Sequence, residues 1–549
     1  MGEAQHSELL SGVPESSNTS LMDSSSDEGQ LKRRRFKSSE GDLVRAFLIL
    51  FIPILIFDLI FRAAARAFWF DEILTILVAR QPSISGIWTL LSNGVTTHPP
   101  VMYIIEHWLG KIGGNERIVL RLPSIAAFLS ILACMFVFIK RRTGPLIALV
   151  STAALLLTLA FDFYAFEARP YELMVLCIAV ALVSYDRVDS VGGISLFWLS
   201  LALASSVNFY AGFAFLPFGL AELSYLITER KLRLKIWLGF LAGMLPYIFF
   251  WPLLRKQEVL FGAHNWASPT LGKLENSYGE LLHLATIPSC AIFAAAMAYL
   301  IYLAFSGNSD SRQGEAAGIE FRLPDLALAI GFLVIPVVTY GVTLLGHGAI
   351  TGRYVIATTL GIPLALGVFL TRLRMPAVLS VGFLIIFAFL CQEAVMAGAF
   401  LLPLDRKYSV QPPMEVASKM GIPVVVSNGL LFLPIWYAGN DQVKSQLYFL
   451  DEPEEQYRAT GSDTWTLLLR MLPDYIPIHV QKFSEFGGSH RKFLIYSSGD
   501  ADDYWPGLLV SRGYKIRTIY IGPPTSMGSQ IGVTDTKTIL YLVDLDDHN

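Results

Sequence analysis

The chain has 549 residues, of which 53% are hydrophobic, and its mean hydropathy is +0.51. Only 16% are charged, against roughly a quarter in an average soluble protein, and a net charge of −3 gives no reason to expect nucleic acid as a partner. This composition excludes a soluble globular protein and predicts a polytopic protein of the lipid bilayer. The cysteines lie inside apolar stretches without a close pair, which predicts neither a disulfide nor a zinc framework. They are Cys134, Cys177, Cys290 and Cys391.

Residues 1–40 differ from the rest of the chain in composition. They are rich in Ser, Glu and Asp, nearly free of aromatic residues, and contain the basic run from Lys32 to Arg35. Such a segment buries too little apolar surface to fold alone, so we expect a disordered cytoplasmic tail. The apolar run that follows, residues 43–61, is too long for a typical signal-peptide core, so we expect no cleavage.

Residues 41–402 form the expected transmembrane domain, a mainly α helical bundle. Apolar runs long enough to cross a hydrocarbon core recur through it. We expect about eleven spans, with the amino terminus inside and the carboxyl terminus outside. The expected spans are residues 43–61, 117–139, 145–163, 170–186, 193–207, 209–228, 235–254, 284–305, 323–345, 353–371 and 376–401.

The distribution of Lys and Arg sets the direction of this threading. Basic clusters at residues 32–35, 140–142, 230–235 and 372–374 all fall on one side, which we expect to be the cytoplasm. The run 99–110 is a candidate for a further span, but it is short, opens with two prolines and carries charged residues. Counting it would move the second basic cluster outside, so we expect an interfacial helix. The protein is then a multi-pass protein of the cell (inner) membrane.

Beyond residue 403 the hydropathy falls, and short apolar runs rich in β-branched residues appear. Candidate helices at 464–472 and 504–512 lie among these runs, so strands alternate with helices. We therefore expect residues 403–549 to form an extracytoplasmic α/β domain, and it carries no glycine-rich nucleotide fingerprint. The expected strands are residues 423–426, 493–496, 516–521 and 538–543.

Polar residues that hydropathy does not explain gather in the outer loops of this threading. The first outer loop carries an adjacent acidic pair, Asp71 and Glu72, just beyond the first span. Acidic side chains near lipid are costly unless they are paired or used, and we interpret this pair as active-site carboxylates. Further acids, arginines and tyrosines reach the same interface. These candidates are His98, Tyr103, Arg121, Glu167, Arg169, Tyr171, Arg353 and Tyr354.

The motifs in these loops resemble the bacterial polytopic (C-type) glycosyltransferases related to the protein O-mannosyltransferases and the lipid A aminoarabinose transferase. The resemblance has specific motifs over roughly residues 43–230, and it continues to about residue 400 as topology with an Arg-Tyr pair. Besides the acidic pair, the motifs are His98-Pro99-Pro100 with Tyr103 after it, Arg121-Leu122-Pro123-Ser124, and the Glu-Ala-Arg-Pro-Tyr run of residues 167–171.

The resemblance implies an outward-facing membrane cavity that takes a sugar from a polyprenyl phosphate donor and passes it to an acceptor hydroxyl on a lipid, glycan or protein. Such a donor already carries a good leaving group, so the enzyme mainly has to deprotonate the acceptor and hold the phosphate. We interpret Asp71 as the base, with Glu72 as its helper or as an acceptor-positioning group. We expect Glu167 to share the base role or to orient the acceptor. Arg169 and Arg353 are expected to bind phosphate oxygens.

Each assignment has a structural alternative. An acidic pair at a helix start also stabilises the helix dipole, and Glu167 with Arg169 also fits a local ion pair. His98, which we expect to hydrogen-bond the sugar or Asp71, also fits a turn. Arg121 also fits a side chain that snorkels at a span end, and the three tyrosines fit interfacial anchors.

Two broader questions stay open at the sequence level. Carboxylates can hold a divalent cation, yet arginines can neutralise a phosphate instead, so we expect no obligatory metal or other cofactor. The alternative function is a transporter or flippase for a lipid-linked saccharide. Transporters commonly show internal repeats and helices interrupted at the bilayer midplane, whereas here we find no repeat and the polar residues lie at one interface. A non-catalytic scaffold does not explain the acids in the loops.

Overall fold

The computed structural model describes most of the chain, and contacts divide it into two compact units, Met1–Ile54 and Leu55–Asn549. The statements below concern the second unit unless the first is named. The described residues are 21–262, 264–305, 321–346, 348–401, 411–499, 503–524 and 537–548.

Helix α1 (Leu21–Ala65) contains the first expected span and begins inside the segment expected to be a disordered tail. Residues 1–20 of that segment lie outside the described residues. The residues from Leu31 to Arg35 are good helix formers, which fits a helix that starts before the apolar run.

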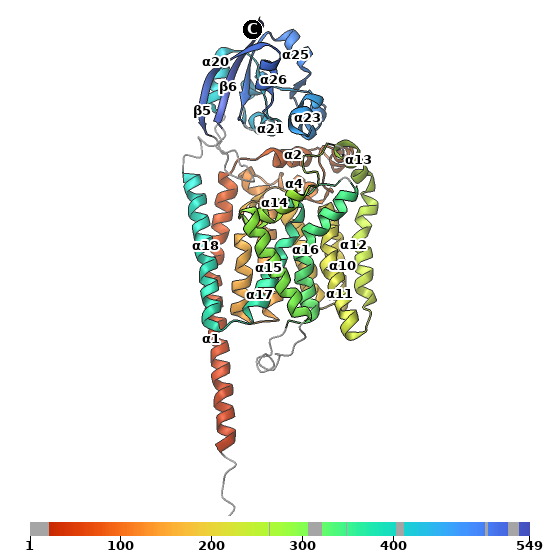
Figure 1. Cartoon of the computed structure of the whole chain (residues 1–549), viewed down its shortest axis with the longest axis vertical. Coiled ribbons are helices and arrows are strands. Elements are labelled where there is room, and N and C mark those ends of the chain that lie inside the picture. Colours follow the sequence, from red (N-terminus) through yellow and green to blue (C-terminus); the bar gives the residue numbers. More distant parts are fainter. Residues whose placement is uncertain are drawn as a thin grey trace, which may run out of the picture. The chain divides into compact units, whose positions relative to one another are not determined.

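In the described part of the chain up to residue 401, the regular secondary structure consists of helices (Figure 1). After α1 they are α2 (Phe70–Ala79), α3 (Ile84–Asn93), α4 (Val101–Leu109), α5 (Glu116–Val119), α6 (Leu122–Lys140), α7 (Pro145–Ala153), η1 (Ala154–Leu157), α8 (Leu159–Asp162), η2 (Tyr164–Phe166), α9 (Tyr171–Tyr185), α10 (Val191–Val207), η3 (Phe209–Ala214), α11 (Phe215–Glu229), α12 (Leu234–Phe249), α13 (Trp251–Phe261), α14 (Leu271–Leu282), α15 (Thr286–Phe305), α16 (Leu323–Gly346), η5 (Gly352–Leu360), α17 (Gly361–Leu370) and α18 (Met375–Leu401).

Every expected span coincides with one or more of these helices. In the described part of the chain, seven helices are long and apolar enough to cross a membrane, and two helix pairs bent by 59° and 60° raise that number to as many as nine. The remaining two expected spans are α9 and α10, which are apolar but only 15 and 17 residues long. The expected number of about eleven spans therefore exceeds nine because it counts these two shorter helices as spans.

The run 99–110, which the sequence left ambiguous, forms the nine-residue helix α4. At 1.5 Å per residue it is roughly 14 Å long, about half of what a hydrocarbon core requires. It packs against α2 instead of crossing the bundle. The choice of a short interfacial helix over a span agrees with this geometry.

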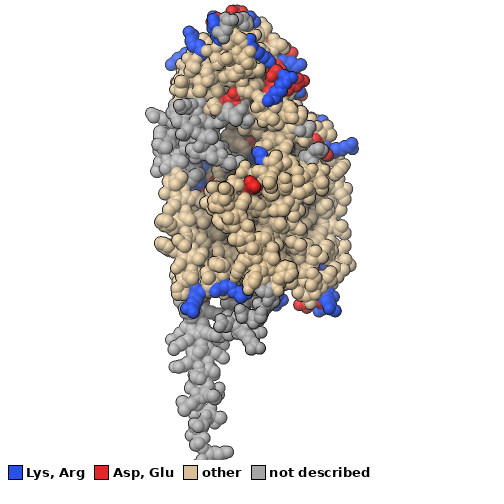
Figure 2. Space-filling model, viewed as in Figure 1, with Lys and Arg blue, Asp and Glu red and all other residues tan. Residues whose placement is uncertain are grey.

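Apolar side chains cover the outside of the bundle, which appears as a broad band with few charged residues in Figure 2. Leu345 of α16 is 90% exposed and Ile287 of α15 is 84% exposed. Leaving such side chains in water costs about 25 cal/mol for each Å² of apolar surface. This surface is therefore suited to lipid.

Charged residues lie at the two ends of the bundle helices. At one end, Arg142 donates hydrogen bonds to Asp186, which follows α9, and to Asp325 in the first turn of α16, at 2.7 Å each. Arg141 also bonds Asp186, at 3.1 Å. In Figure 2, Lys and Arg side chains gather along the lower end of the bundle. The end of α6, the end of α9 and the start of α16 thus meet, as the expected alternation of span directions requires.

The chain after residue 410 forms an α/β domain, as expected. In its described part, six strands form one sheet in the order β3-β2-β1-β4-β6-β5. β1 to β4 pair in parallel, and β6 is antiparallel to both β4 and β5. The four expected strands correspond to β1, β4, β5 and β6. The elements are α20 (Gln411–Met420), β1 (Val424–Val426), α21 (Gly429–Ala438), α22 (Asp441–Gln446), β2 (Leu447–Leu450), α23 (Pro453–Thr460), α24 (Thr464–Met471), β3 (His479–Gln481), α25 (Phe483–Ser489), β4 (Lys492–Ser497), α26 (Trp505–Ser511), β5 (Tyr514–Pro524) and β6 (Lys537–His548).

The sheet domain and α2 share one hydrophobic core. Phe70, Ile73 and Ile76 of α2 are buried together with Phe432 and Leu469 of the sheet domain. Helix α21 packs directly on α2. The helix that carries the acidic pair is therefore held from two sides, by α4 and by the sheet domain.

Candidate active site

Asp71 lies in the first turn of α2, against two arginines from distant parts of the chain. Its Oδ2 atom accepts a hydrogen bond of 2.8 Å from Arg353 Nη1, and Arg169 Nη2 lies 3.4 Å from the same oxygen. Arg169 Nη1 also donates to the backbone oxygen of Asp71 and to Thr75 Oγ1, at 3.2 Å each. All three charged side chains are buried. One carboxylate thus faces two guanidinium groups, and the cluster has a net charge of about +1.

Glu72, next in sequence, is part of a separate ion pair. Arg121 donates to both of its carboxylate oxygens, from Nε at 2.8 Å and from Nη2 at 2.7 Å. The backbone N–H of Ala168 donates to Oε1 at 2.9 Å. Both side chains have no exposed surface. Arg121 therefore does not snorkel toward solvent, and Glu72 has its acceptor capacity largely filled within the protein.

The remaining donors of Arg121 bind the loop between α1 and α2. Its guanidinium donates to the backbone oxygens of Ala63, Arg66 and Ala67, at 2.7, 2.7 and 3.2 Å. Arginine suits this task because its planar group offers five N–H donors in a fixed geometry. The Glu72–Arg121 pair therefore fixes the start of α2, and with it the position of Asp71.

Glu167 is a buried acid with spare hydrogen-bonding capacity. It has no exposed surface. Its Oε1 atom lies 3.3 Å from Arg66 Nη2, and its Oε2 atom has no partner among the described residues. Burial raises the pKa of Glu167 to about 7, although the charge of Arg66 lowers it. A carboxyl group with this pKa can exchange a proton near neutral pH.

His98 contacts Arg169 instead of Asp71. Arg169 Nη2 lies 2.9 Å from His98 Nε2, and because a guanidinium can only donate, the ring nitrogen accepts. Burial, together with the positive charges of Arg169 and Arg353, holds the pKa of His98 well below its usual range. The imidazole is therefore neutral at pH 7, and it helps to orient Arg169.

The candidate tyrosines surround the arginines. Tyr103 and Tyr171 have no exposed surface, so neither is an interfacial anchor. The hydroxyl of Tyr171 lies 3.5 Å from Arg169 Nη2. Tyr354 stacks on Tyr210 with ring centroids 4.3 Å apart, and Arg353 lies over the Tyr354 ring at 5.3 Å. Aromatic faces stabilise buried cations, so these rings favour the charged arginines.

The structure adds site residues that the sequence did not point to. Glu280 of α14 accepts hydrogen bonds from Thr351 Oγ1, at 2.9 Å, and from the backbone N–H of Gly352, so it holds the turn before Arg353. Trp266 lies under the Arg353 guanidinium, 5.0 Å from its carbon to the ring centroid. Both residues come from the segment between α13 and α15, which has no motif. Of the added residues, Arg66 was the easiest to identify from the sequence, because it is a basic residue just after the first expected span.

A group of three or more His, Cys, Asp or Glu side chains that could hold a metal ion does not occur within the described residues. The arginines supply the positive charge at Asp71. Independence from metal ions stays a prediction.

Comparisons with known proteins identify the fold of the chain. Family models and curated proteins give no match to the chain. Two crystal structures of ArnT from Cupriavidus metallidurans align with 90% of this chain and 98% of their own. The apo state gives a TM-score of 0.52 at 13% sequence identity, and the state bound to undecaprenyl phosphate gives 0.51 at 12%.

The chain has the ArnT fold. The likeness to ArnT confirms the expected architecture, a mainly helical bundle followed by a small sheet domain. Together with the apolar helices, the ArnT fold makes the chain an integral membrane protein. At these identities the likeness concerns the fold, so what the side chains do has to be argued from their own geometry.

Proposed function

We propose that the protein is a membrane glycosyltransferase that moves a sugar from a polyprenyl phosphate donor to an acceptor hydroxyl at the outer face of the inner membrane. The observation that carries this proposal is the buried cluster of Asp71 with Arg353 and Arg169 at one end of an ArnT-like bundle. One of the ArnT structures is bound to undecaprenyl phosphate. A positively charged cluster that can bind a phosphate, with a carboxylate beside it, suits such a transfer.

The donor phosphate is a singly charged phosphodiester with two free oxygens. Guanidinium groups bind such oxygens through paired, charge-assisted hydrogen bonds. We expect the phosphate to take the place of the Asp71 carboxylate on Arg353 and Arg169. The incoming negative charge then releases Asp71 from its ion pairs without leaving either arginine unpaired.

The released Asp71 carboxylate accepts the proton of the acceptor hydroxyl. The hydroxyl oxygen forms a bond to the anomeric carbon of the donor sugar, and the bond between that carbon and the phosphate oxygen breaks. The electron pair of the broken bond stays on the leaving polyprenyl phosphate. Arg353 and Arg169 stabilise this growing negative charge, which is the usual role of fixed cations around a leaving group.

The neighbouring residues support this step in different ways. Glu167 has a free carboxylate oxygen, and we assign it the orientation of the acceptor hydroxyl. His98 holds Arg169 in place through the 2.9 Å hydrogen bond. Glu72 takes no direct part, because Arg121 and Ala168 already occupy its oxygens.

Release of polyprenyl phosphate distinguishes an enzyme from the alternative, a transporter of the lipid-linked sugar, and the Asp71→Asn variant tests the role of Asp71 as the base. An amide keeps the size of the side chain but cannot accept the proton, and loss of a general base costs roughly 10² to 10⁴ in rate. Purified protein is mixed with lipid extract of the host membrane as donor and with host membranes as acceptor. Mass spectrometry then follows the release of polyprenyl phosphate.

Wild-type protein is expected to release polyprenyl phosphate, and Asp71→Asn is expected to be at least about 100-fold slower. Asp189→Asn serves as the matched control, because Asp189 is exposed at the opposite end of the bundle, after α9. Equal release by both variants would refute the role of Asp71 as the base, whereas absence of release by the wild-type protein would refute the enzyme and favour the transporter.

A further inference from the structure

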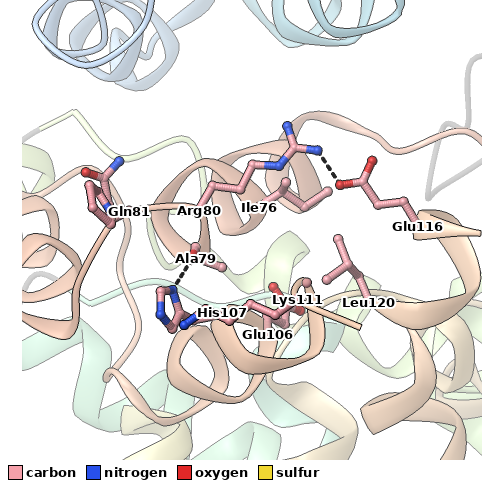
Figure 3. Close-up of a pocket in the computed structure, with 11 residues that line it drawn as sticks. Ile76, Ala79, Arg80, Gln81, Glu106, His107, Lys111, Glu116 and Leu120 are labelled. Atoms are coloured by element: carbon pink, nitrogen blue, oxygen red, sulfur yellow. Dashed lines mark hydrogen bonds and ion pairs between the residues drawn. The ribbon is translucent and has the colours of Figure 1, made fainter. Parts of the chain in front are cut away.

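A cavity of about 320 Å³ lies at the far end of α2 from Asp71, between α2 and α4 (Figure 3). Ile76 and Leu120 form apolar parts of its wall, and Arg80, Glu106 and Lys111 contribute polar parts. Its volume is at the low end of the roughly 300 to 1,000 Å³ typical of small-molecule sites. The cavity is separate from the arginine cluster at Asp71 and has no part in the transfer step described above.

Glu106 is the unusual residue in this cavity. It is only 1% exposed, and neither carboxyl oxygen has a partner among the described residues. Burial raises the pKa of Glu106 well above its usual value, and the charge of Glu72 raises it further, although the charge of Arg169 lowers it. A buried acid without a partner is costly, so a ligand that bonds it stabilises the protein. A protonated carboxyl group offers one donor and one acceptor, which matches a hydroxyl group.

The charges around the cavity nearly cancel. Arg80 forms an ion pair with Glu116, as the dashed line in Figure 3 shows. The hydroxyl of Tyr437 joins this pair, 3.1 Å from Arg80 Nη2 and 3.0 Å from Glu116 Oε2. Lys111 lies 3.9 Å above the Trp108 ring. This mixture of donors and acceptors differs from the paired arginines at Asp71, and it suits a neutral ligand rich in hydroxyl groups better than a phosphate.

Helix α2 sets the distance between Asp71 and the cavity. Asp71 lies in its first turn and Arg80 just after its last residue, which corresponds to roughly 13 Å along the axis at 1.5 Å per residue. Leu120 lines the cavity, while Arg121 next to it pairs with Glu72. A ligand in the cavity is therefore too far from Asp71 to react, but close enough to belong to the same molecule as the reacting hydroxyl.

We propose that this cavity binds a sugar unit of the acceptor, remote from the hydroxyl that receives the transferred sugar. The acceptor is then a molecule that carries at least two saccharide units, such as a glycolipid or a glycan. This inference rests on the proposed function. Binding energy from a remote part of a substrate is a common way to hold the reacting part in place.

The test is saturation-transfer NMR on full-length purified protein with single neutral sugars: glucose, galactose, mannose, N-acetylglucosamine, xylose and arabinose. At least one sugar is expected to give a signal with wild-type protein. Glu106→Met should weaken it about tenfold, because it removes both the donor and the acceptor, whereas Glu106→Gln keeps a donor and an acceptor and should retain most of the signal. Lys111→Met is a second variant at an exposed position, with little risk to folding, and should also weaken it.

Asp71→Asn is the control that separates the two proposals. It should keep the sugar signal, because Asp71 does not line the cavity, whatever it does to sugar transfer. Absence of a signal for every sugar, or a signal that survives Glu106→Met and Lys111→Met unchanged, would overturn the acceptor site. Binding of inorganic phosphate at the cavity would overturn it as well. An active Asp71→Asn variant would instead contradict the proposed function alone.

A different set of contacts carries a second inference, on the role of the sheet domain. Trp465 of α24 meets Phe70, the residue before Asp71, edge to face at 5.5 Å. It also stacks on Trp266 at 6.1 Å, and Trp266 lies under Arg353. One side chain of the sheet domain therefore touches the neighbours of both members of the Asp71–Arg353 pair.

The loop that carries Trp266 is fastened to the same domain. His264 Nδ1 lies 3.0 Å from Asp463 Oδ2, and its ring stacks on Tyr457 at 3.9 Å. Ser462 Oγ donates to the backbone oxygen of His264 at 2.9 Å. Because the described residues of this loop have no regular secondary structure, these contacts help to determine where Trp266 lies.

We infer that the sheet domain positions the donor site through Trp465, which is a positioning residue and not a catalytic one. Given the proposed function, Trp465→Ala should weaken the binding of undecaprenyl phosphate several-fold while the melting temperature stays within the range of the control Trp251→Ala, an exposed tryptophan of α13. Trp465→Phe should restore most of the affinity.

Unchanged affinity in Trp465→Ala would overturn this second inference. Loss of affinity that Trp465→Phe does not restore would also overturn it. Failure of the wild-type protein to bind undecaprenyl phosphate would contradict the proposed function instead.

Discussion

Replacing Arg353 with lysine keeps the positive charge beside Asp71 but removes the planar group that can bind two oxygens at once. In the structure Arg353 Nη1 bonds Asp71 Oδ2 at 2.8 Å, and the guanidinium lies over the Trp266 and Tyr354 rings at 5.0 and 5.3 Å. A lysine at this position can supply one charged contact and no stacked plane.

The expected loss follows from these contacts. One hydrogen bond to a charged group contributes about 1.5 to 3 kcal/mol, which corresponds to a factor of roughly 10 to 150 in affinity. We therefore expect Arg353→Lys to weaken the binding of undecaprenyl phosphate by about one to two orders of magnitude. Because Arg353 is buried, salt should screen this interaction only weakly.

The assay is a titration of purified protein in lipid nanodiscs with undecaprenyl phosphate, followed by native mass spectrometry. Arg374→Lys is the matched control, because Arg374 is exposed in the turn between α17 and α18. It is expected to bind like the wild type. If both lysine variants bind equally well, Arg353 does not contact the phosphate and the donor site lies elsewhere.

Three further predictions concern stability and topology. Arg121→Met leaves the fully buried Glu72 without its partner and should lower the free energy of unfolding by about 3 to 5 kcal/mol, seen as a lower melting temperature in detergent; an unchanged midpoint would contradict the structural role of this pair. Because burial raises the pKa of Glu167 to about 7, the unfolded chain ionises first as the pH rises, so wild type should lose stability relative to Glu167→Gln between about pH 4.5 and 7, by at most on the order of 3 kcal/mol. Parallel melting curves over that range would show that the carboxyl group is not shifted. In a background without the native cysteines, Ser92→Cys should react with an impermeant reagent in intact cells and Ser190→Cys only after permeabilisation; equal reaction would refute the predicted sidedness.

Much of the helical bundle was predictable from the sequence, because apolar runs of this length leave the backbone no other way to satisfy its hydrogen bonds in lipid. The short helix α4 was predictable for the same reason, since its run is too short to span. Strands β2 and β3 have only four and three residues. β1 is equally short, but its three residues are all valine, whereas β2 holds no β-branched residue and β3 holds only one, so these two strands do not stand out.

The sequence predicted which residues form the site better than it predicted which of them pair with one another. The motifs brought Asp71, Arg169 and Arg353 into one group, and the structure joins them. The bond between Glu72 and Arg121 spans 49 positions, and the contact of His98 with Arg169 replaces the expected one with Asp71. Such pairs depend on how helices pack, which a linear pattern does not record.

Two aromatic residues from outside the motifs could not be predicted from the sequence. Trp266 and Trp465 reach the site only because a loop after α13 and a helix of the sheet domain meet over α2. Nothing in the local sequence of either segment marks it as part of a site. The role of the sheet domain therefore follows from the three-dimensional contacts alone.

The central claim is that Asp71 takes part in sugar transfer, and comparative mass spectrometry of cell-envelope lipids and glycans tests it most directly. Cells that lack the protein are compared with the same cells expressing wild type or Asp71→Asn at matched levels. We predict one envelope component that gains the mass of a single sugar only with wild type. The account is contradicted if the Asp71→Asn cells carry the same modified component in the same amount.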